Sequence, residues 1–342
     1  MSRLAMVMAG AAMGGAETFY VRIVSALAAA GEEVLAVIRR DPARAAALRA
    51  AGLAPVELAF GGPLDLLTGR RLARELRAFA PGLVMSWMNR AARFTPAGPW
   101  TRVGRLGGYY DLSYWRGFDH LVGNTRGIVA WIVAQGWPED RVHHLPNFVP
   151  DLAGAEPVPR RALEVPDDAL LVLAMGRLHR VKGFDTLIAA LARLPRAVAV
   201  IAGEGPERSA LETVARRSGV ADRVRFLGWR SDQAGLLAAA DVFVCPSRQE
   251  PLGNVVLEAW SAGRPVVACR AAGPEELIEP GRTGLLVPVD DPSALAEAIR
   301  RVAEEPGLAR ALAAAGRAAW AAEFAPPPVV ARWRDLLGRL SR

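Results

Sequence analysis

Lysine is almost missing from this sequence of 342 residues, because Lys182 is the single lysine among 42 basic residues and the rest are arginines. Long hydrophobic runs are also missing, and none approaches the roughly 20 apolar residues that cross a bilayer. Residues 4–17 superficially resemble a signal peptide, but their glycine loop and βαβ spacing favour a first strand. The two cysteines, Cys245 and Cys269, lie in apolar runs, which favours buried thiols of a cytosolic protein over a disulfide or metal site.

Acidic residues are fewer than basic ones, 35 against 42, so the net charge is +7. This balance favours anionic partners: nucleic acid, an acidic membrane surface or a phosphorylated substrate. The sequence has no recognition-helix motif, zinc pattern or aromatic RNA-binding signature, so we expect no nucleic-acid partner. Residues 66–79 predict a helix that could rest on anionic lipid at the inner face of the cytoplasmic membrane. An ordinary solvated helix is the alternative for this segment, whose basic residues are Arg70, Arg71, Arg74 and Arg77.

Short apolar runs alternate with helical patterns along the whole chain, which predicts an α/β protein with parallel sheets. The length favours two domains, and the proline-rich residues 146–168 predict the linker between them. We therefore expect Rossmann-like domains at residues 1–152 and 160–325. The predicted strands lie in residues 4–9, 32–38, 82–87, 119–124, 169–176, 197–205, 223–228, 241–247 and 264–270.

The first candidate loop, GAAMGGAE, follows the first predicted strand. Gly14 and Gly15 would let backbone amides approach a phosphate at a helix N-terminus, although tight packing alone also explains such glycines. The spacing is similar to that of short-chain dehydrogenases, where Arg39 and Arg40 would hold an NADP phosphate. That chemistry needs a Tyr-x-x-x-Lys pair, and the position four residues before Lys182 is Leu178.

Two further loops follow predicted strands of the second half, at the strand ends where parallel sheets bind ligands. In GRLHRVKGFD, Arg177 and Lys182 would project beside each other, and two such cations suit a diphosphate. A chance surface lysine is the alternative. The turn with Gly203 and Glu204 could line the same site, or could be a plain strand-to-helix turn.

The most specific segment is SRQEPLGNVVLEAW, where two carboxylates stand eight residues apart. We expect a helix to begin near Gly253, so that free amides at Asn254 and Val255 bind an anion. Glu250 could then accept hydrogen bonds from sugar hydroxyls. Glu258 has apolar neighbours, so its carboxylate should be partnered or functional, and it could bind a ribose diol. The turn between Glu250 and Gly253 contains Pro251 and Leu252.

Together these motifs resemble the retaining glycosyltransferases of family 4, which have the GT-B fold. The resemblance is strongest over residues 170–300, through the loops above and EELIEPGRTGLLV. It implies two Rossmann-like domains facing across a cleft and a last helix, residues 326–342, that returns to the first domain. It assigns a nucleotide-diphospho-sugar to the second domain, with Arg177 and Lys182 on the diphosphate, Glu250 on the sugar and Glu258 on the ribose.

The first domain departs from that family at one place. Many members carry a histidine near the acceptor just after a strand, but here Gly107 or Gly108 occupies that place. Asp111 is the nearest carboxylate; it could contact the acceptor or donor sugar, or simply cap a turn. The block GGYYDLSYWRG is similar to a subgroup that builds lipopolysaccharide core or related envelope glycans, which implies a glycan or lipid-linked acceptor.

Carboxylate pairs of the Asp-x-Asp type, which hold Mg²⁺ or Mn²⁺ in many sugar transferases, are also missing. We therefore expect transfer without a metal or other cofactor, with protein cations and helix amides stabilising the leaving diphosphate. Retention at the anomeric carbon comes from the resemblance. A phosphorylase with lysine-bound pyridoxal phosphate is the competing enzyme class, but the single lysine cannot serve both as its anchor and as a phosphate ligand.

Overall fold

The computed structural model describes residues 3–11, 14–62 and 65–341, and its contacts divide the chain into two units. Unit 1 comprises Met1–Phe148 and Pro326–Arg342, and unit 2 comprises Val149–Ala325. Unit 2 thus starts before the predicted boundary at residue 152. Val149 donates from its amide to the Phe324 carbonyl (3.3 Å), and Asp151 pairs with Arg317, so the supposed linker packs on unit 2.

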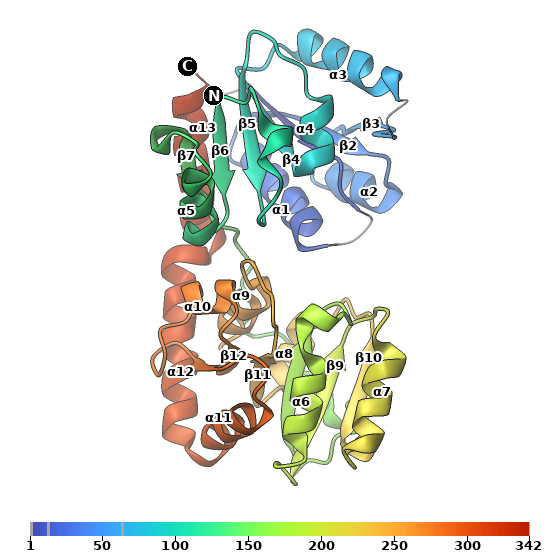
Figure 1. Cartoon of the computed structure of the whole chain (residues 1–342), viewed down its shortest axis with the longest axis vertical. Helices are drawn as coiled ribbons and strands as arrows, with labels where there is room; N and C mark the ends of the chain where they lie inside the picture. Colours follow the sequence, from blue (N-terminus) through green and yellow to red (C-terminus); the bar gives the residue numbers. More distant parts are fainter. Residues whose placement is uncertain (1–2, 12–13, 63–64, 342) are drawn as a thin grey trace. The chain divides into compact units, whose positions relative to one another are not determined.

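The described part of unit 1 forms a seven-stranded parallel sheet in the order β3-β2-β1-β4-β5-β6-β7 (Figure 1). Its strands are β1 (Arg3–Met8), β2 (Glu33–Arg39), β3 (Val56–Leu58), β4 (Leu83–Trp87), β5 (Thr101–Leu106), β6 (His120–Gly123) and β7 (Val142–His144). Its helices are α1 (Gly15–Ala29), α2 (Pro42–Ala50), α3 (Leu66–Phe79), α4 (Met88–Phe94), α5 (Arg126–Ala134) and α13 (Pro326–Leu340).

The described part of unit 2 forms a six-stranded parallel sheet in the order β10-β9-β8-β11-β12-β13. Its strands are β8 (Leu170–Met175), β9 (Ala197–Ala202), β10 (Val224–Gly228), β11 (Val242–Cys245), β12 (Val266–Cys269) and β13 (Leu285–Val287). Its helices are α6 (Phe184–Leu191), α7 (Arg208–Arg217), α8 (Gln233–Ala239), α9 (Asn254–Ser261), α10 (Ala272–Leu277), α11 (Pro292–Glu304) and α12 (Pro306–Ala319).

Each sheet is buried on both faces, because helices cover both, and side chains along a strand alternate between the two cores. In β8, Val172 and Ala174 join the core under α6 and α11, whereas Leu171 and Leu173 join the core under α8 and α9. This double covering explains why the central strands read as unbroken apolar runs. The prediction of parallel α/β sheets is confirmed.

All the predicted strands are present, but β3, β5, β7 and β13 were not predicted. Three of these have only three residues each, and β5 has the sequence TRVGRL, with two arginines and a glycine. The predicted last helix is α13, which packs on α1 within unit 1. In the described residues, no helix is long and apolar enough to cross a membrane.

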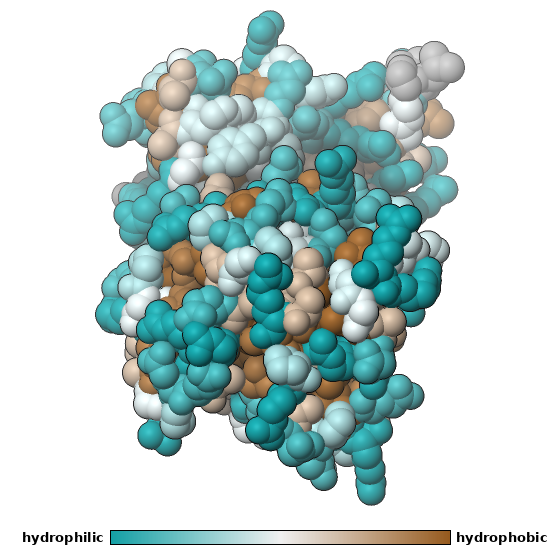
Figure 2. Space-filling view, turned by 60° about the horizontal axis from the view of Figure 1, so that its bottom comes forward, coloured by the Kyte–Doolittle hydropathy of each residue, from teal (hydrophilic) through white to brown (hydrophobic). Residues whose placement is uncertain are grey.

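The surface of unit 2 that Figure 2 brings forward is mainly hydrophilic, and hydrophobic residues show between the polar side chains. Both cysteines are buried free thiols, as expected. Burial raises the pKa of Cys245 to about 11 and that of Cys269 to about 12, so both thiols are protonated at neutral pH.

Candidate active site

The strand order of unit 2 reverses between β8 and β11, and ligands of open parallel sheets bind at the carboxyl ends beside such a reversal. The loop after β8 turns at Gly176, contains a 3-10 turn (Arg180–Lys182) and enters α6 through Gly183. Gly183 has a φ of 63°, and an added Cβ would overlap the Pro246 carbonyl oxygen. The loops after β8 and β11 therefore lie in direct contact, which a larger residue at 183 would prevent.

Lys182 and Glu250, predicted from separate motifs, form an ion pair across these two loops. The side chains are 24% and 12% exposed, so the pair is largely shielded from water. Ser247, buried in the same loop, donates from its hydroxyl to the same Glu250 oxygen at 3.4 Å. The sole lysine of the chain thus lies where the sheet order reverses, beside the carboxylate predicted to bind sugar.

Arg177 is exposed in the loop after β8, and among the described residues it has no hydrogen bond or ion pair. Its guanidinium is therefore available to a ligand. Glu258 is half-buried in the second turn of α9, the helix that starts next to the Glu250 loop. That these two residues line one hollow together with Lys182 stays a prediction.

α9 begins where the sequence predicted, with Gly253 as its N-cap in the left-handed region (φ 91°) and no side chain capping the first turn. The preceding turn is held from its other side, because Gly273 donates its amide to the Glu250 carbonyl at 2.7 Å. Leu252 is buried in this turn, and Asn254 and Val255 are half-buried in the first turn of the helix.

The Gly203-Glu204 turn is tied into the structure, as in the plain-turn alternative. The Gly203 amide donates to the Gly228 carbonyl at 2.8 Å, and an added Cβ would overlap the Gly176 carbonyl oxygen. That amide is therefore not available to a ligand. That the turn lines the donor site stays a prediction. Glu204 is exposed and lies 3.8 Å from the Arg208 guanidinium.

In unit 1, the loop after β1 is filled by a side chain that the sequence analysis missed. Glu17 is buried, and its carboxylate accepts a hydrogen bond from the Ala11 amide at 2.8 Å. An added Cβ at Gly10 or Gly14 would overlap the Glu17 side chain, so these glycines make room for it. The close contact of Gly14 with Glu17 agrees with the packing alternative for this glycine. Gly15 begins α1. Residues 12 and 13 of the loop lie outside the described part.

A buried arginine lies next to Gly107, one of the two glycines at the place of the family histidine. An added Cβ at Gly107 would lie 2.6 Å from an Nη of Arg105, a residue that the sequence analysis missed. Arg105 is buried, donates to the Asn147 side chain at 2.5 Å and lies over the Trp87 ring at 4.5 Å. Burial lowers the pKa of Arg105 to about 10, so the guanidinium keeps its charge at neutral pH. Asp111 is exposed and caps a 3-10 turn by accepting from the Ser113 amide at 2.9 Å, as in its structural alternative.

A possible metal site and a surface hollow were the remaining candidates in the described residues. Within residues 3–11, 14–62 and 65–341, no three His, Cys, Asp or Glu side chains form a group that could hold a metal ion. A surface hollow of about 450 Å³ beside β10, lined among others by Glu164, Arg208 and Arg225, contains none of the predicted site residues.

Known proteins resemble the chain over its length. Residues 169–305 match the family described as glycosyl transferases group 1. Two lipopolysaccharide core biosynthesis glycosyltransferases of Rhizobium meliloti (strain 1021) are similar to the chain: LpsD is 36% identical, covering 95% of each chain, and LpsE is 37% identical, covering 95% of this chain and 96% of its own. The crystal structure of Anabaena HepE in complex with UDP-glucose has a TM-score of 0.88 at 22% identity, covering 99% of this chain and 100% of that one. With two parallel-sheet units and close relatives over nearly its whole length, the chain belongs to the group 1 glycosyltransferases and has the GT-B fold.

Proposed function

We propose that unit 2 binds a nucleotide-diphospho-sugar at the carboxyl ends of β8 and β11. The observation that carries this proposal is the Lys182–Glu250 pair, which joins a cation suited to phosphate and an acceptor suited to sugar hydroxyls at the reversal of strand order. The complex of HepE with UDP-glucose supports this class of donor.

In this proposal, Arg177 and Lys182 bind the diphosphate, and the first-turn amides of α9 at Asn254 and Val255 add the positive end of the helix dipole. Glu250 accepts hydrogen bonds from the donor sugar and Glu258 from the ribose. Lys182 is partly neutralised by Glu250 while no donor is bound, so the ammonium is already placed and costs little to reorganise when phosphate arrives.

The reaction breaks the bond between the anomeric carbon and the diphosphate oxygen, and the electron pair stays on that oxygen. The acceptor hydroxyl oxygen forms the new bond to the same carbon, with retention of configuration, and its proton passes to the leaving phosphate. Arg177, Lys182 and the α9 amides stabilise the charge that grows on the leaving group. Because these positive groups come from the protein, we propose that no metal ion takes part.

The acceptor is proposed to be a glycan or a lipid-linked saccharide of the cell envelope, in lipopolysaccharide core synthesis. The support is the name shared by LpsD and LpsE and their coverage of nearly the whole chain. We propose a cytoplasmic enzyme that works at the inner face of the membrane. In α3, Arg70, Arg71, Arg74 and Arg77 are all exposed.

Leu72 and Leu76 of α3 are not available to lipid, because they are buried in the core of unit 1. Leu67, at the start of the helix, is 63% exposed. The proposed membrane contact of α3 is therefore electrostatic, through the four arginines, and not an insertion of a hydrophobic helix face.

A thermal-shift screen of UDP-, GDP- and ADP-sugars in the presence of EDTA tests the donor and the metal together. A specific donor at 100 times its Kd should stabilise the fold by about 2.7 kcal/mol. In a separate transfer reaction with that donor, the anomeric proton coupling of the product, measured by NMR, reports retention or inversion. If none of these sugars raises Tm, or if the shift needs Mg²⁺ or Mn²⁺, the proposal is wrong.

A further inference from the structure

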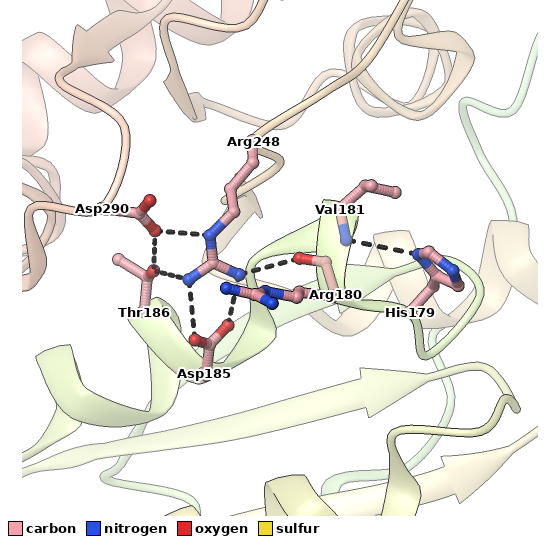
Figure 3. A network of polar contacts seen from close by, with 7 residues as sticks. All are labelled: His179, Arg180, Val181, Asp185, Thr186, Arg248 and Asp290. Atoms are coloured by element: carbon pink, nitrogen blue, oxygen red, sulfur yellow. Dashed lines mark hydrogen bonds and ion pairs between the residues drawn. The ribbon is translucent and has the colours of Figure 1, made fainter.

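Arg248, two residues before Glu250, uses every hydrogen-bond donor of its guanidinium (Figure 3). Its Nε donates to Asp290 at 2.6 Å. One terminal nitrogen donates to the Arg180 carbonyl and to Asp185, both at 2.8 Å. The other donates to Asp185 at 2.7 Å and to the Thr186 hydroxyl at 3.4 Å. A guanidinium has five N–H groups, so none remains for a substrate.

Apart from Asp290, the acceptors lie on both sides of Lys182 in the chain. Arg180 opens the 3-10 turn that ends at Lys182, and Asp185 lies in the first turn of α6. The backbone also joins the two loops, because the amides of Arg248 and Gln249 both donate to the Val181 carbonyl, at 2.8 and 3.1 Å. The loop that carries Glu250 is thus fastened to the loop that carries Lys182 by one side chain and two amides.

The chemistry of this contact requires arginine. Asp185 accepts two parallel bonds from the planar fork, and an ammonium cannot match such a bidentate contact. Although burial alone would raise it, hydrogen bonding to Arg248 holds the pKa of Asp185 below its ordinary value. The two charges are therefore paired over the whole range of neutral pH. The Arg248 side chain is 21% exposed and that of Asp185 is 41% exposed, so the pair is partly shielded from water.

We propose that Arg248 is a positioning residue, which fixes the distance and orientation of Lys182 relative to Glu250 by clamping their two loops together. It acts through Asp185 and the Arg180 carbonyl and does not touch the substrate. Its effect on sugar transfer rests on the proposed function, but its effect on the Lys182–Glu250 pair does not.

The single lysine makes this testable without any substrate. Acylation of Lys182 by acetylimidazole, followed by mass spectrometry of the peptide that contains it, measures how available the ammonium is. Glu250→Gln removes the partner of Lys182 and sets the largest expected increase in acylation rate. Arg248→Ala should raise the rate several-fold toward that value. Arg300→Ala is the matched control, because Arg300 is exposed and pairs with Glu297 and Glu304 along its own helix, α11, and this variant should acylate like the wild type.

A folded Arg248→Ala protein with a wild-type acylation rate would overturn the proposal. If that variant does not fold, Arg248→Lys takes its place, because an ammonium has three donors for the five contacts and should also raise the rate. In a transfer assay, Arg248→Ala should lower kcat by up to about 10²-fold, as a misplacement of about 1 Å does, and should add little to the loss caused by Lys182→Ala. Equal and additive losses would instead indicate direct substrate contact. If the wild type binds no nucleotide-sugar, the proposed function fails while the acylation result still decides the role of Arg248.

Discussion

Lys182 and Glu250 are 68 residues apart in the sequence and form an ion pair where the loops after β8 and β11 meet. Both loops leave the sheet at its carboxyl edge, on neighbouring strands, so the topology itself places them together. The pair combines the only lysine of the chain with a carboxylate that is 12% exposed. The predictions below follow from this pair and from the groups that hold it.

Replacing Glu250 by Gln should lower both activity and stability. The substitution keeps the shape but removes the charge that faces Lys182, so the ammonium stays partly buried without its partner. We expect a loss of about 1.5–3 kcal/mol in the free energy of unfolding, the range for hydrogen bonds to charged groups. Urea unfolding measures it. An unchanged midpoint would show that the pair contributes nothing to the folded state.

Gly183 and Gly219 form a matched pair for testing the contact between the two loops. Both have positive φ, 63° and 66°, but an added Cβ at Gly183 overlaps the Pro246 carbonyl, whereas at Gly219 it has nothing within 4 Å. Gly219→Ala should therefore show only the cost of left-handed backbone, about 1–2 kcal/mol. Gly183→Ala should destabilise the protein by clearly more, and it should also lower turnover. Equal denaturation midpoints for the two variants would contradict the close loop contact.

Two histidines in unit 1 predict a loss of stability in acid. His143 Nε2 lies 3.1 Å from His120 Nδ1, and burial, followed by the charges of His120 and Arg339, lowers the pKa of His143 to about 4. Histidine in an unfolded chain titrates near 6.5. Between these values the unfolded state binds more protons, so stability falls as the pH falls from about 6.5 to 4.

The slope of the urea midpoint against pH measures this effect. His143→Gln should flatten the slope between pH 6.5 and 4 relative to the wild type. A wild-type slope in the His143 variant would show that other groups cause the acid sensitivity.

The basic face of α3 predicts binding to acidic membranes. Arg70, Arg71 and Arg77 have no ion pair among the described residues, whereas Arg74 pairs with Glu75. Changing all four arginines to Gln should remove flotation with vesicles that contain phosphatidylserine, because each basic residue near such a surface contributes about 1 kcal/mol. Double replacement of Arg300 and Arg301, which pair with glutamates on α11 or beside it, is the control. Unchanged flotation of the α3 variant would leave this helix as an ordinary solvated one.

The sequence predicted the fold well where local pattern decides it. Central strands such as β8 and β11 are apolar on both faces, and a central position in a doubly covered sheet requires that pattern. The start of α9 could be predicted because Gly253 is a residue type favoured at helix N-caps. β5 could not be predicted, because Arg105 in it is buried among residues distant in the sequence, namely Phe19, Trp87 and Asn147.

The candidate site was predicted as a set of motifs, but not as a set of contacts. Glu17 carried no signal beyond its place after the glycines, and its burial depends on how the loop after β1 folds back. Arg248 looked like one arginine among 41, and only the structure shows that its five donors are all engaged. Conversely, Gly203 fitted a ligand loop by its sequence, yet its amide is used by the neighbouring strand end. Such partners are set by tertiary contacts, which spacing along the chain does not encode.

The most direct test of metal-free leaving-group stabilisation is the turnover of Lys182→Ala relative to the wild type, measured in EDTA with the donor found in the screen. The account predicts that the wild type keeps its full rate in EDTA, and that the variant remains folded while its rate falls by about 10²–10³-fold, the usual cost of losing one such donor. A wild type that loses its activity in EDTA, or a folded Lys182→Ala variant with near-normal turnover, would contradict it.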